Sequence, residues 1–253
     1  MRNLAGVGQE EKCMNELLNA VLRAHGGVER WKTFNKVRAT FVSGGGLLPM
    51  KGIEVIPMPV AGTATIHEES TIISPFRQPG WTMRFTPKRV VVEADDGTIV
   101  AERSNPRDAF AGHSLSSPWD LLQQAYFNGY ARWTYLTTPF LMAMPGMEVS
   151  EIEPWHEGSE VWRGLRLRFA EDIASHSREQ DFYFGSDFLL RRHDYRFEIG
   201  GDVAVAQYVS DMVESDGFWF PSKRRAYVRG PKLRPIHDLL LISLDISNYS
   251  VEV

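Results

Sequence analysis

Hydrophobic and polar residues along the chain repeat with two different periods. In residues 10–25 the apolar positions recur three and four apart, which predicts an amphipathic helix that ends at Gly26–Gly27. From Val37 the period changes to two, as in "KVRATFV", where apolar residues alternate with Lys36 and Arg38. This alternation is typical of a half-buried strand.

Short alternating segments continue along most of the chain, and Gly, Pro and Asp separate them. The Asp-Gly pair in "ADDGT" (94–98) predicts a tight hairpin turn. The expected strand segments are 36–46, 52–58, 62–73, 80–94, 98–104, 160–170, 179–185, 188–199, 203–214, 218–229 and 239–253. Strands at this spacing predict an α+β protein built on a large curved antiparallel sheet, with helices packed on its concave side.

The pattern becomes helical between about residues 116 and 140. Ser117 is the expected N-cap, with Pro118 at the first helical position and Asp120 at the third. One face of this helix carries aromatic residues, whereas Gln123, Gln124, Asn128 and Arg132 fall on other faces. No linker or repeat divides the chain, so we expect one domain over residues 1–253 with a helical insert at 116–140.

Composition and charge exclude several classes of protein. The net charge of −4 and the pI of about 6.0 argue against a non-specific nucleic-acid binder. The only cysteine, Cys13, permits no intrachain disulfide, and no stretch of about 18 apolar residues predicts a transmembrane segment. The first 22 residues lack the apolar core of a signal peptide, so we expect a cytoplasmic protein.

Motifs that would identify a cofactor or a metal are absent. Neither a Gly-rich phosphate loop nor a G-x-S-x-G elbow occurs, and we expect no cofactor. None of the seven histidines has the H-x-H, H-x-x-x-H or H-E-x-x-H spacing, although a site assembled across strands stays open. The histidines are His25, His67, His113, His156, His176, His193 and His237.

The segment "SHSREQDFYFGSDFLLRRHDY" (175–195) alternates like a hairpin and is rich in polar side chains. On its second strand His193 shares a face with Tyr195 and Phe197, whereas Asp194 falls on the opposite, charged face. His193 is therefore either a hydrogen-bonded core residue or a group that contacts a ligand.

Several segments together resemble the LolA/LolB-like lipoprotein-carrier superfamily. They are "AHGGVERW", which ends the first helix, the stretch Gly217–Pro221 followed by a basic strand, and "LLLISLDISNYSV" with Asp245 near the end. The resemblance implies an incomplete β-barrel whose mouth is plugged by helices. It also implies a hydrophobic cavity for an acyl chain or a similar ligand.

The leading hypothesis is therefore a soluble protein that binds a hydrophobic small molecule or lipid. The expected ligand-contacting residues are Trp119, Tyr126, Tyr130, Trp133, Tyr183 and Tyr195.

The alternative is a cofactor-independent enzyme of the cyclase, isomerase or hydrolase type that acts on a hydrophobic metabolite. His193 with Asp194 would supply acid–base catalysis, and His113 and His176 are further candidates. A third hypothesis is a protein-interaction module with an exposed aromatic surface. An open sheet edge would also allow a homodimer.

Overall fold

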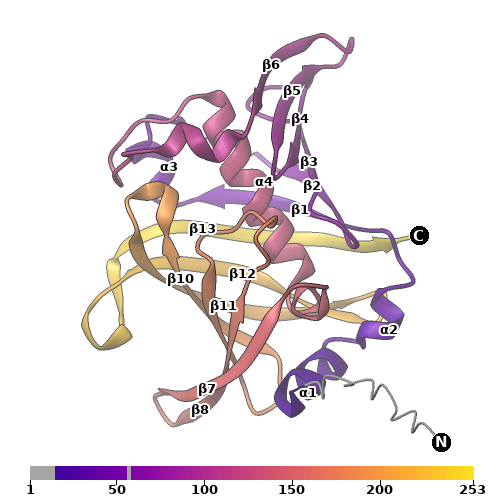
Figure 1. Cartoon of the computed structure of the whole chain (residues 1–253), viewed down its shortest axis with the longest axis vertical. Helices are drawn as coiled ribbons and strands as arrows, with labels where there is room; N and C mark the ends of the chain where they lie inside the picture. The colour runs from indigo at the N-terminus through magenta and orange to yellow at the C-terminus, as the bar shows by residue number, and fades with distance from the viewer. Residues whose placement is uncertain (1–14, 56–57) are drawn as a thin grey trace, which may run out of the picture.

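A computed structural model describes residues 15–55 and 58–253 (Figure 1). The helices are α1 (Glu16–Ala24), α2 (Val28–Trp31), α3 (Leu47–Met50) and α4 (Leu121–Thr137), with 3₁₀ turns η1 (Pro106–Phe110), η2 (Phe140–Ala143), η3 (Glu198–Gly200) and η4 (Pro231–Leu233). The strands are β1 (Lys36–Gly44), β2 (Val60–Thr65), β3 (Thr71–Ser74), β4 (Trp81–Thr86), β5 (Arg89–Ala94), β6 (Ile99–Ser104), β7 (Glu148–Glu157), β8 (Glu160–Arg168), β9 (Glu179–Phe184), β10 (Leu190–Phe197), β11 (Val203–Ser215), β12 (Phe218–Arg229) and β13 (Pro235–Glu252). The start of the predicted first helix, with Cys13, lies outside the described residues.

The strands of the described residues form one antiparallel sheet of thirteen strands. Its order is β6-β5-β4-β3-β2-β1-β13-β12-β11-β10-β9-β8-β7. The long strand β13 pairs with β1 and so joins the first and last parts of the chain (Figure 1). Since β6 and β7 stand at opposite edges and do not pair with each other, the sheet is a curved, incomplete barrel, as the alternation predicts.

Alternation within strands sets the side chains that face the interior. On β1, Val37, Ala39 and Phe41 are each no more than 1% exposed, whereas Lys36 and Arg38 are exposed. The same pattern places the concave faces of the other strands in one apolar core. No described helix is long and apolar enough to cross a membrane.

Helix α4 lies inside the curve of the sheet and packs against β1 to β6 (Figure 1). Every residue from Leu122 to Thr137 is buried. A helix that is buried all round belongs to the core of a protein, so α4 fills the mouth of the half-barrel. The helix predicted at 116–140 is therefore present, and it packs on the concave side as expected.

The predicted start of this helix is wrong by three residues. Asp120 is the N-cap: its carboxylate accepts the amide hydrogen of Gln123 at 2.8 Å, and Gln123 Oε1 accepts the amide hydrogen of Asp120 at 2.9 Å. This reciprocal capping box satisfies two amide groups that would otherwise have no partner. Ser117 instead accepts a hydrogen bond from the amide of Ser114 within the preceding loop.

Two strand predictions also need correction. The described residues of segment 52–58 belong to no strand, and β2 begins only at Val60. Pro59 has no amide hydrogen for a sheet ladder, and α3 redirects the chain just before this segment. Conversely, Glu148–Glu157 forms edge strand β7, which the alternation did not single out.

Gly129 lets α4 approach β4 closely. A Cβ atom at this position would lie 2.2–2.6 Å from side-chain atoms of Phe85. The hydroxyl of Thr71 also donates to the carbonyl oxygen of Gly129 at 3.1 Å, which ties β3 to the same turn of the helix.

We expect Gly129→Ala to lower the free energy of unfolding by about 1–3 kcal/mol, because the added methyl group overpacks the contact with Phe85. Urea denaturation measures the effect. Alanine has a higher helix propensity than glycine by about 1 kcal/mol. A gain of stability would therefore show that helix propensity alone determines the effect, and it would contradict the close contact with Phe85.

Candidate functional site

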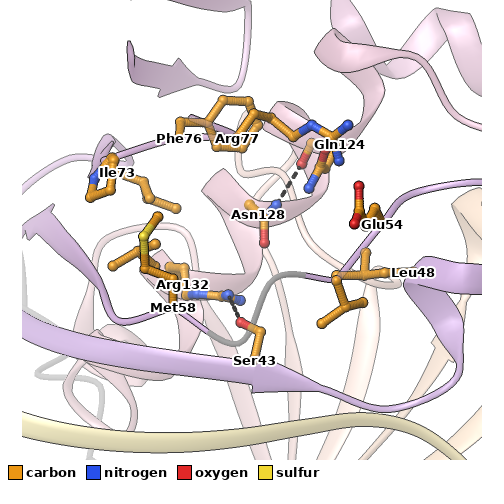
Figure 2. Close-up of a pocket in the computed structure, with 13 residues that line it drawn as sticks. Ser43, Leu48, Glu54, Met58, Ile73, Phe76, Arg77, Gln124, Asn128 and Arg132 are labelled. Carbon is orange, nitrogen blue, oxygen red and sulfur yellow. Dashed lines mark hydrogen bonds between the residues drawn. The ribbon is translucent and has the colours of Figure 1, made fainter. Parts of the chain in front are cut away.

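A pocket of about 180 Å³ lies between α4 and the first three strands (Figure 2). Ser43 from β1, Val60 from β2 and Ile73 from β3 contribute to its wall, and the exposed residues Glu54 and Arg77 also line it. Its apolar lining residues are Leu48, Val55, Met58, Val60, Ile73, Pro75 and Phe76. We call this site the α4 pocket.

The helix side of the α4 pocket is polar. Gln124, Asn128 and Arg132 are spaced four residues apart, so they lie one above another on one face of α4 (Figure 2). All three are buried, with 5–8% of their surface exposed. Asn128 Nδ2 donates to the main-chain oxygen of Gln124 at 3.0 Å, whereas the side-chain amide of Gln124 makes no hydrogen bond to the described residues.

Arg132 carries a buried positive charge at the base of this stripe. Its Nη2 donates to Ser43 Oγ at 2.9 Å, and its guanidinium carbon lies 4.9 Å from the ring centre of Phe41. Within the described residues its buried Nε has no hydrogen-bond partner and no carboxylate lies within ion-pair distance. Burial lowers the pKa of Arg132 to about 10.

The size and chemistry of the α4 pocket limit what it can hold. A dry cavity of about 150 Å³ accepts one benzene molecule, so the pocket accommodates a small apolar group beside the polar stripe. Within the described residues no cluster of three or more His, Cys, Asp or Glu side chains is placed to bind a metal ion. The lining contains apolar groups and hydrogen-bond donors, which suits an amphiphilic organic ligand.

Two of the expected ligand-contacting residues on α4 tie the helix to other elements. Trp133 Nε1 donates to the carbonyl oxygens of Thr65 and Glu68, both at 3.0 Å. Tyr130 OH forms a hydrogen bond with His176 Nδ1 at 3.1 Å. Neither residue lines the α4 pocket.

Trp119 lies just before α4, and Tyr126 lies in the first half of the helix. Trp119 packs against Phe110, and the Lys51 ammonium group lies 4.8 Å from its ring centre. Tyr126 lies 3.4 Å from Arg107 Nη1 and lines a second pocket of about 280 Å³. The aromatic face of α4 thus faces several different neighbours instead of one shared cavity.

The interior between α4 and the later strands is filled by a hydrogen-bonded network. His176 Nε2 contacts Tyr135 OH at 3.1 Å, and the His176 ring stacks on Tyr195 with centroids 3.9 Å apart. Gln207 Nε2 donates to Tyr135 OH, and Arg224 Nη1 donates to Gln207 Oε1. Burial, followed by the positive charges of Arg107 and Arg224, lowers the pKa of His176 to about 3.

Strand β10 separates the proposed catalytic pair. His193 is fully buried in the interior, where its Nε2 lies 2.5 Å from Gln180 Oε1. Asp194 points to the opposite face and forms an ion pair with Arg192 at 2.6 Å. Tyr183 lies on that same outer side, with the Arg192 guanidinium 5.8 Å from its ring centre.

His113 contacts other residues near the start of α4. Its Nε2 lies 3.4 Å from Gln123 Nε2, and its ring packs edge-on against Phe110. The structure therefore brings His193 and Tyr195 together, with ring centres 4.8 Å apart, but does not join them to His113 or Asp194.

The α4 pocket was not found by sequence reasoning, although the residues of its stripe were noted. A signal was present: Gln124, Asn128 and Arg132 repeat every four residues within a helix that is otherwise rich in aromatic residues. On a surface helix such a stripe faces water, but on a helix enclosed by a sheet it must face a buried polar site.

Comparison with known proteins identifies the fold. A protein of the DUF1329 family from Desulfovibrio piger is 11% identical, with a TM-score of 0.54, and the match covers 94% of this chain and 92% of the other. A LolA-superfamily protein from Nitrosomonas europaea is 9% identical, with a TM-score of 0.54 and coverages of 92% and 93%.

A third solved structure is a domain from Vibrio parahaemolyticus that is named for outer-membrane lipoprotein sorting. It is 8% identical, with a TM-score of 0.54 and coverages of 94% and 92%. No protein-family model and no curated protein matches the sequence. The chain therefore has the fold of the LolA-like lipoprotein carriers, which confirms the fold that the sequence resemblance implies.

Proposed function

We propose that this protein binds a hydrophobic small molecule or acyl chain in the α4 pocket. The observation that carries the proposal is the combination of an apolar wall from β2, β3 and the segments beside them with a polar stripe on α4. Ligand sites are mostly apolar concavities with a few polar groups that orient the ligand. A structural neighbour named for lipoprotein sorting supports a lipid-like ligand.

The catalytic alternative has less support. No described residue that lines the α4 pocket is a histidine, and both ring nitrogens of His176 contact tyrosine hydroxyl groups. A general acid or base must reach the proton that it transfers. We therefore propose binding and not catalysis.

Saturable binding of the small neutral fluorescent probe 1-naphthylamine tests this function. Val60→Trp places a large side chain in the pocket and should weaken probe binding by about tenfold or more, since bound apolar surface is lost. Ala61→Trp is the matched control, because neighbouring strand residues point to opposite faces.

Circular dichroism would establish that both tryptophan variants are folded. The absence of saturable probe binding to the wild-type protein would contradict the proposed function, and so would equal binding by the two variants.

A further inference from the structure

We propose that the α4 pocket selects an amphiphilic monoanion, in particular a carboxylic acid with an apolar tail, whose carboxylate is bound by Arg132. The inference rests on the proposed function, because it names the chemical class of ligand for the same site. Its basis is a buried cation that the described part of the protein leaves without a counter-ion.

Burying a charge without a partner is costly. An arginine taken out of water normally retains hydrogen bonds to an acidic group or to several oxygens, because the loss of hydration costs several kcal/mol. Arg132 is 5% exposed, yet the described residues give its guanidinium a single hydrogen bond, to Ser43 Oγ. Its Nε is buried and has no partner among them. The site therefore lacks an acceptor, and a bound carboxylate would supply one.

Two other buried arginines show how few partners Arg132 has. Within the described residues Arg224 also has no carboxylate partner and a buried Nε without a hydrogen bond, but it donates to Gln207 Oε1 at 2.9 Å and to the carbonyl oxygen of Tyr135 at 3.0 Å. Arg192 is also fully buried, but its Nε and Nη2 bind both oxygens of Asp194 at 2.6 and 2.7 Å. The same fold thus provides a bidentate carboxylate for one buried guanidinium. No described carboxylate pairs with the Arg132 guanidinium in this way, and this side chain lines the α4 pocket (Figure 2).

The rest of the polar stripe matches an anion. Gln124 and Asn128 lie above Arg132 and carry side-chain amide groups. Asn128 Nδ2 already donates one hydrogen to the main-chain oxygen of Gln124, so its second hydrogen and the amide of Gln124 can donate to a carboxylate oxygen. Two arginines and one glutamate line the pocket, namely Arg77, Arg132 and Glu54, so its formal charge is +1. A carboxylate, with one negative charge, complements this better than a phosphate monoester, which carries about −1.5 to −2 charges at pH 7.

The apolar wall determines the other half of the ligand. Ile73 and Phe76 lie across the pocket from the polar stripe, and both are nearly fully buried (Figure 2). A ligand that pairs with Arg132 would place its first methylene groups against these side chains. A pocket of about 180 Å³ holds a headgroup and a short length of chain, so a single-chain acid fits and a whole diacyl lipid does not.

Competition between ligands of equal length tests the inference. Octanoate, octanol and octyl phosphate would each be titrated against bound 1-naphthylamine at pH 7. We expect octanoate to bind at least about tenfold more tightly than octanol, because hydrogen bonds to charged groups are the strongest kind in proteins. Octyl phosphate should compete less well than octanoate.

Variants of Arg132 assign the preference to one side chain. Arg132→Gln should remove the advantage of octanoate over octanol. Arg132→Lys should retain only part of it, since an ammonium group cannot form the bidentate pair. Arg38→Gln, which removes an exposed charge on the outer face of β1, is the matched control and should keep the full preference.

The outcomes separate this inference from the proposed function. If the probe binds and octanoate and octanol compete with equal affinity, the inference is overturned but the proposed function stands. The same holds if the preference for octanoate survives in Arg132→Gln. A stronger preference for octyl phosphate would overturn the carboxylate assignment. If neither the probe nor any octyl compound binds, both proposals fail.

Discussion

Replacing Asp194 with asparagine is expected to lower the free energy of unfolding by about 3–5 kcal/mol. Asp194 is 2% exposed and accepts hydrogen bonds from Arg192 and Arg229. Asparagine keeps the shape of the side chain but removes its charge, so the fully buried Arg192 loses its counter-ion. Urea denaturation of the purified variant measures the change.

Asp245→Asn is the matched control for this prediction. Asp245 pairs with Arg225 at 2.6 Å, but 58% of its side chain is exposed. Exposed ion pairs contribute about 0–1 kcal/mol, because water and salt screen them. Similar small losses in both variants would show that Arg192 does not depend on Asp194.

The stability of the protein is expected to fall by roughly 3 kcal/mol between pH 7 and pH 5. Burial lowers the pKa of His25 to about 4, of His176 to about 3 and of His193 well below its ordinary range. The unfolded chain takes up protons at these residues below about pH 6.5, whereas the folded chain does not. Each histidine therefore destabilises the folded state by roughly 2 kcal/mol over this interval.

Glu69 acts in the opposite direction. Burial raises its pKa well above the ordinary range, so the folded state loses stability as the pH rises above about 4.5. Acidification from pH 7 to pH 5 therefore restores part of the stability at this residue, but three histidines together have a larger effect than one carboxyl group.

Urea unfolding at pH 7, 6 and 5 measures the pH dependence. His25→Gln should reduce the loss by roughly 2 kcal/mol, which is the contribution of one buried histidine. His156→Gln, at an exposed position, is the control for substituting a histidine. Stability that is constant or increases from pH 7 to pH 5 would contradict the burial of three neutral histidines.

Local patterns in the sequence were sufficient to predict most of the fold. The alternation at Val37–Phe41 predicted β1, and the Asp-Gly turn at residues 94–98 predicted the β5–β6 hairpin. Both features depend on neighbouring residues only. The antiparallel sheet and its helix could therefore be predicted, and the single-domain, homodimer and cytoplasmic assignments stay predictions.

Details that depend on distant contacts could not be predicted. The register of the β9–β10 hairpin pairs Phe182 with His193 after an irregularity between Leu190 and Arg192, which no local pattern reveals. The N-cap of α4 is Asp120 and not the predicted Ser117, because Gln123 completes a reciprocal pair of hydrogen bonds with Asp120. Several residues compete for such a cap, and side-chain geometry decides among them.

The site was harder to predict because the surroundings of α4 come from the whole sheet. An aromatic face suggested one cavity, but Trp133 and Tyr130 form hydrogen bonds with the chain itself. Gln124, Asn128 and Arg132 were placed only on other faces of the helix, and strands β1 to β3 enclose them. Only the path of strands far from α4 in sequence makes Arg132 a buried charge.

A crystal structure of the protein with 8-bromooctanoate would test the central claim most directly, because the anomalous signal of bromine locates the tail of the ligand. We expect the ligand in the α4 pocket, with its carboxylate within hydrogen-bond distance of Arg132 and its tail against Ile73. A ligand bound elsewhere in the half-barrel, or a pocket that stays empty at a saturating concentration, would contradict the account.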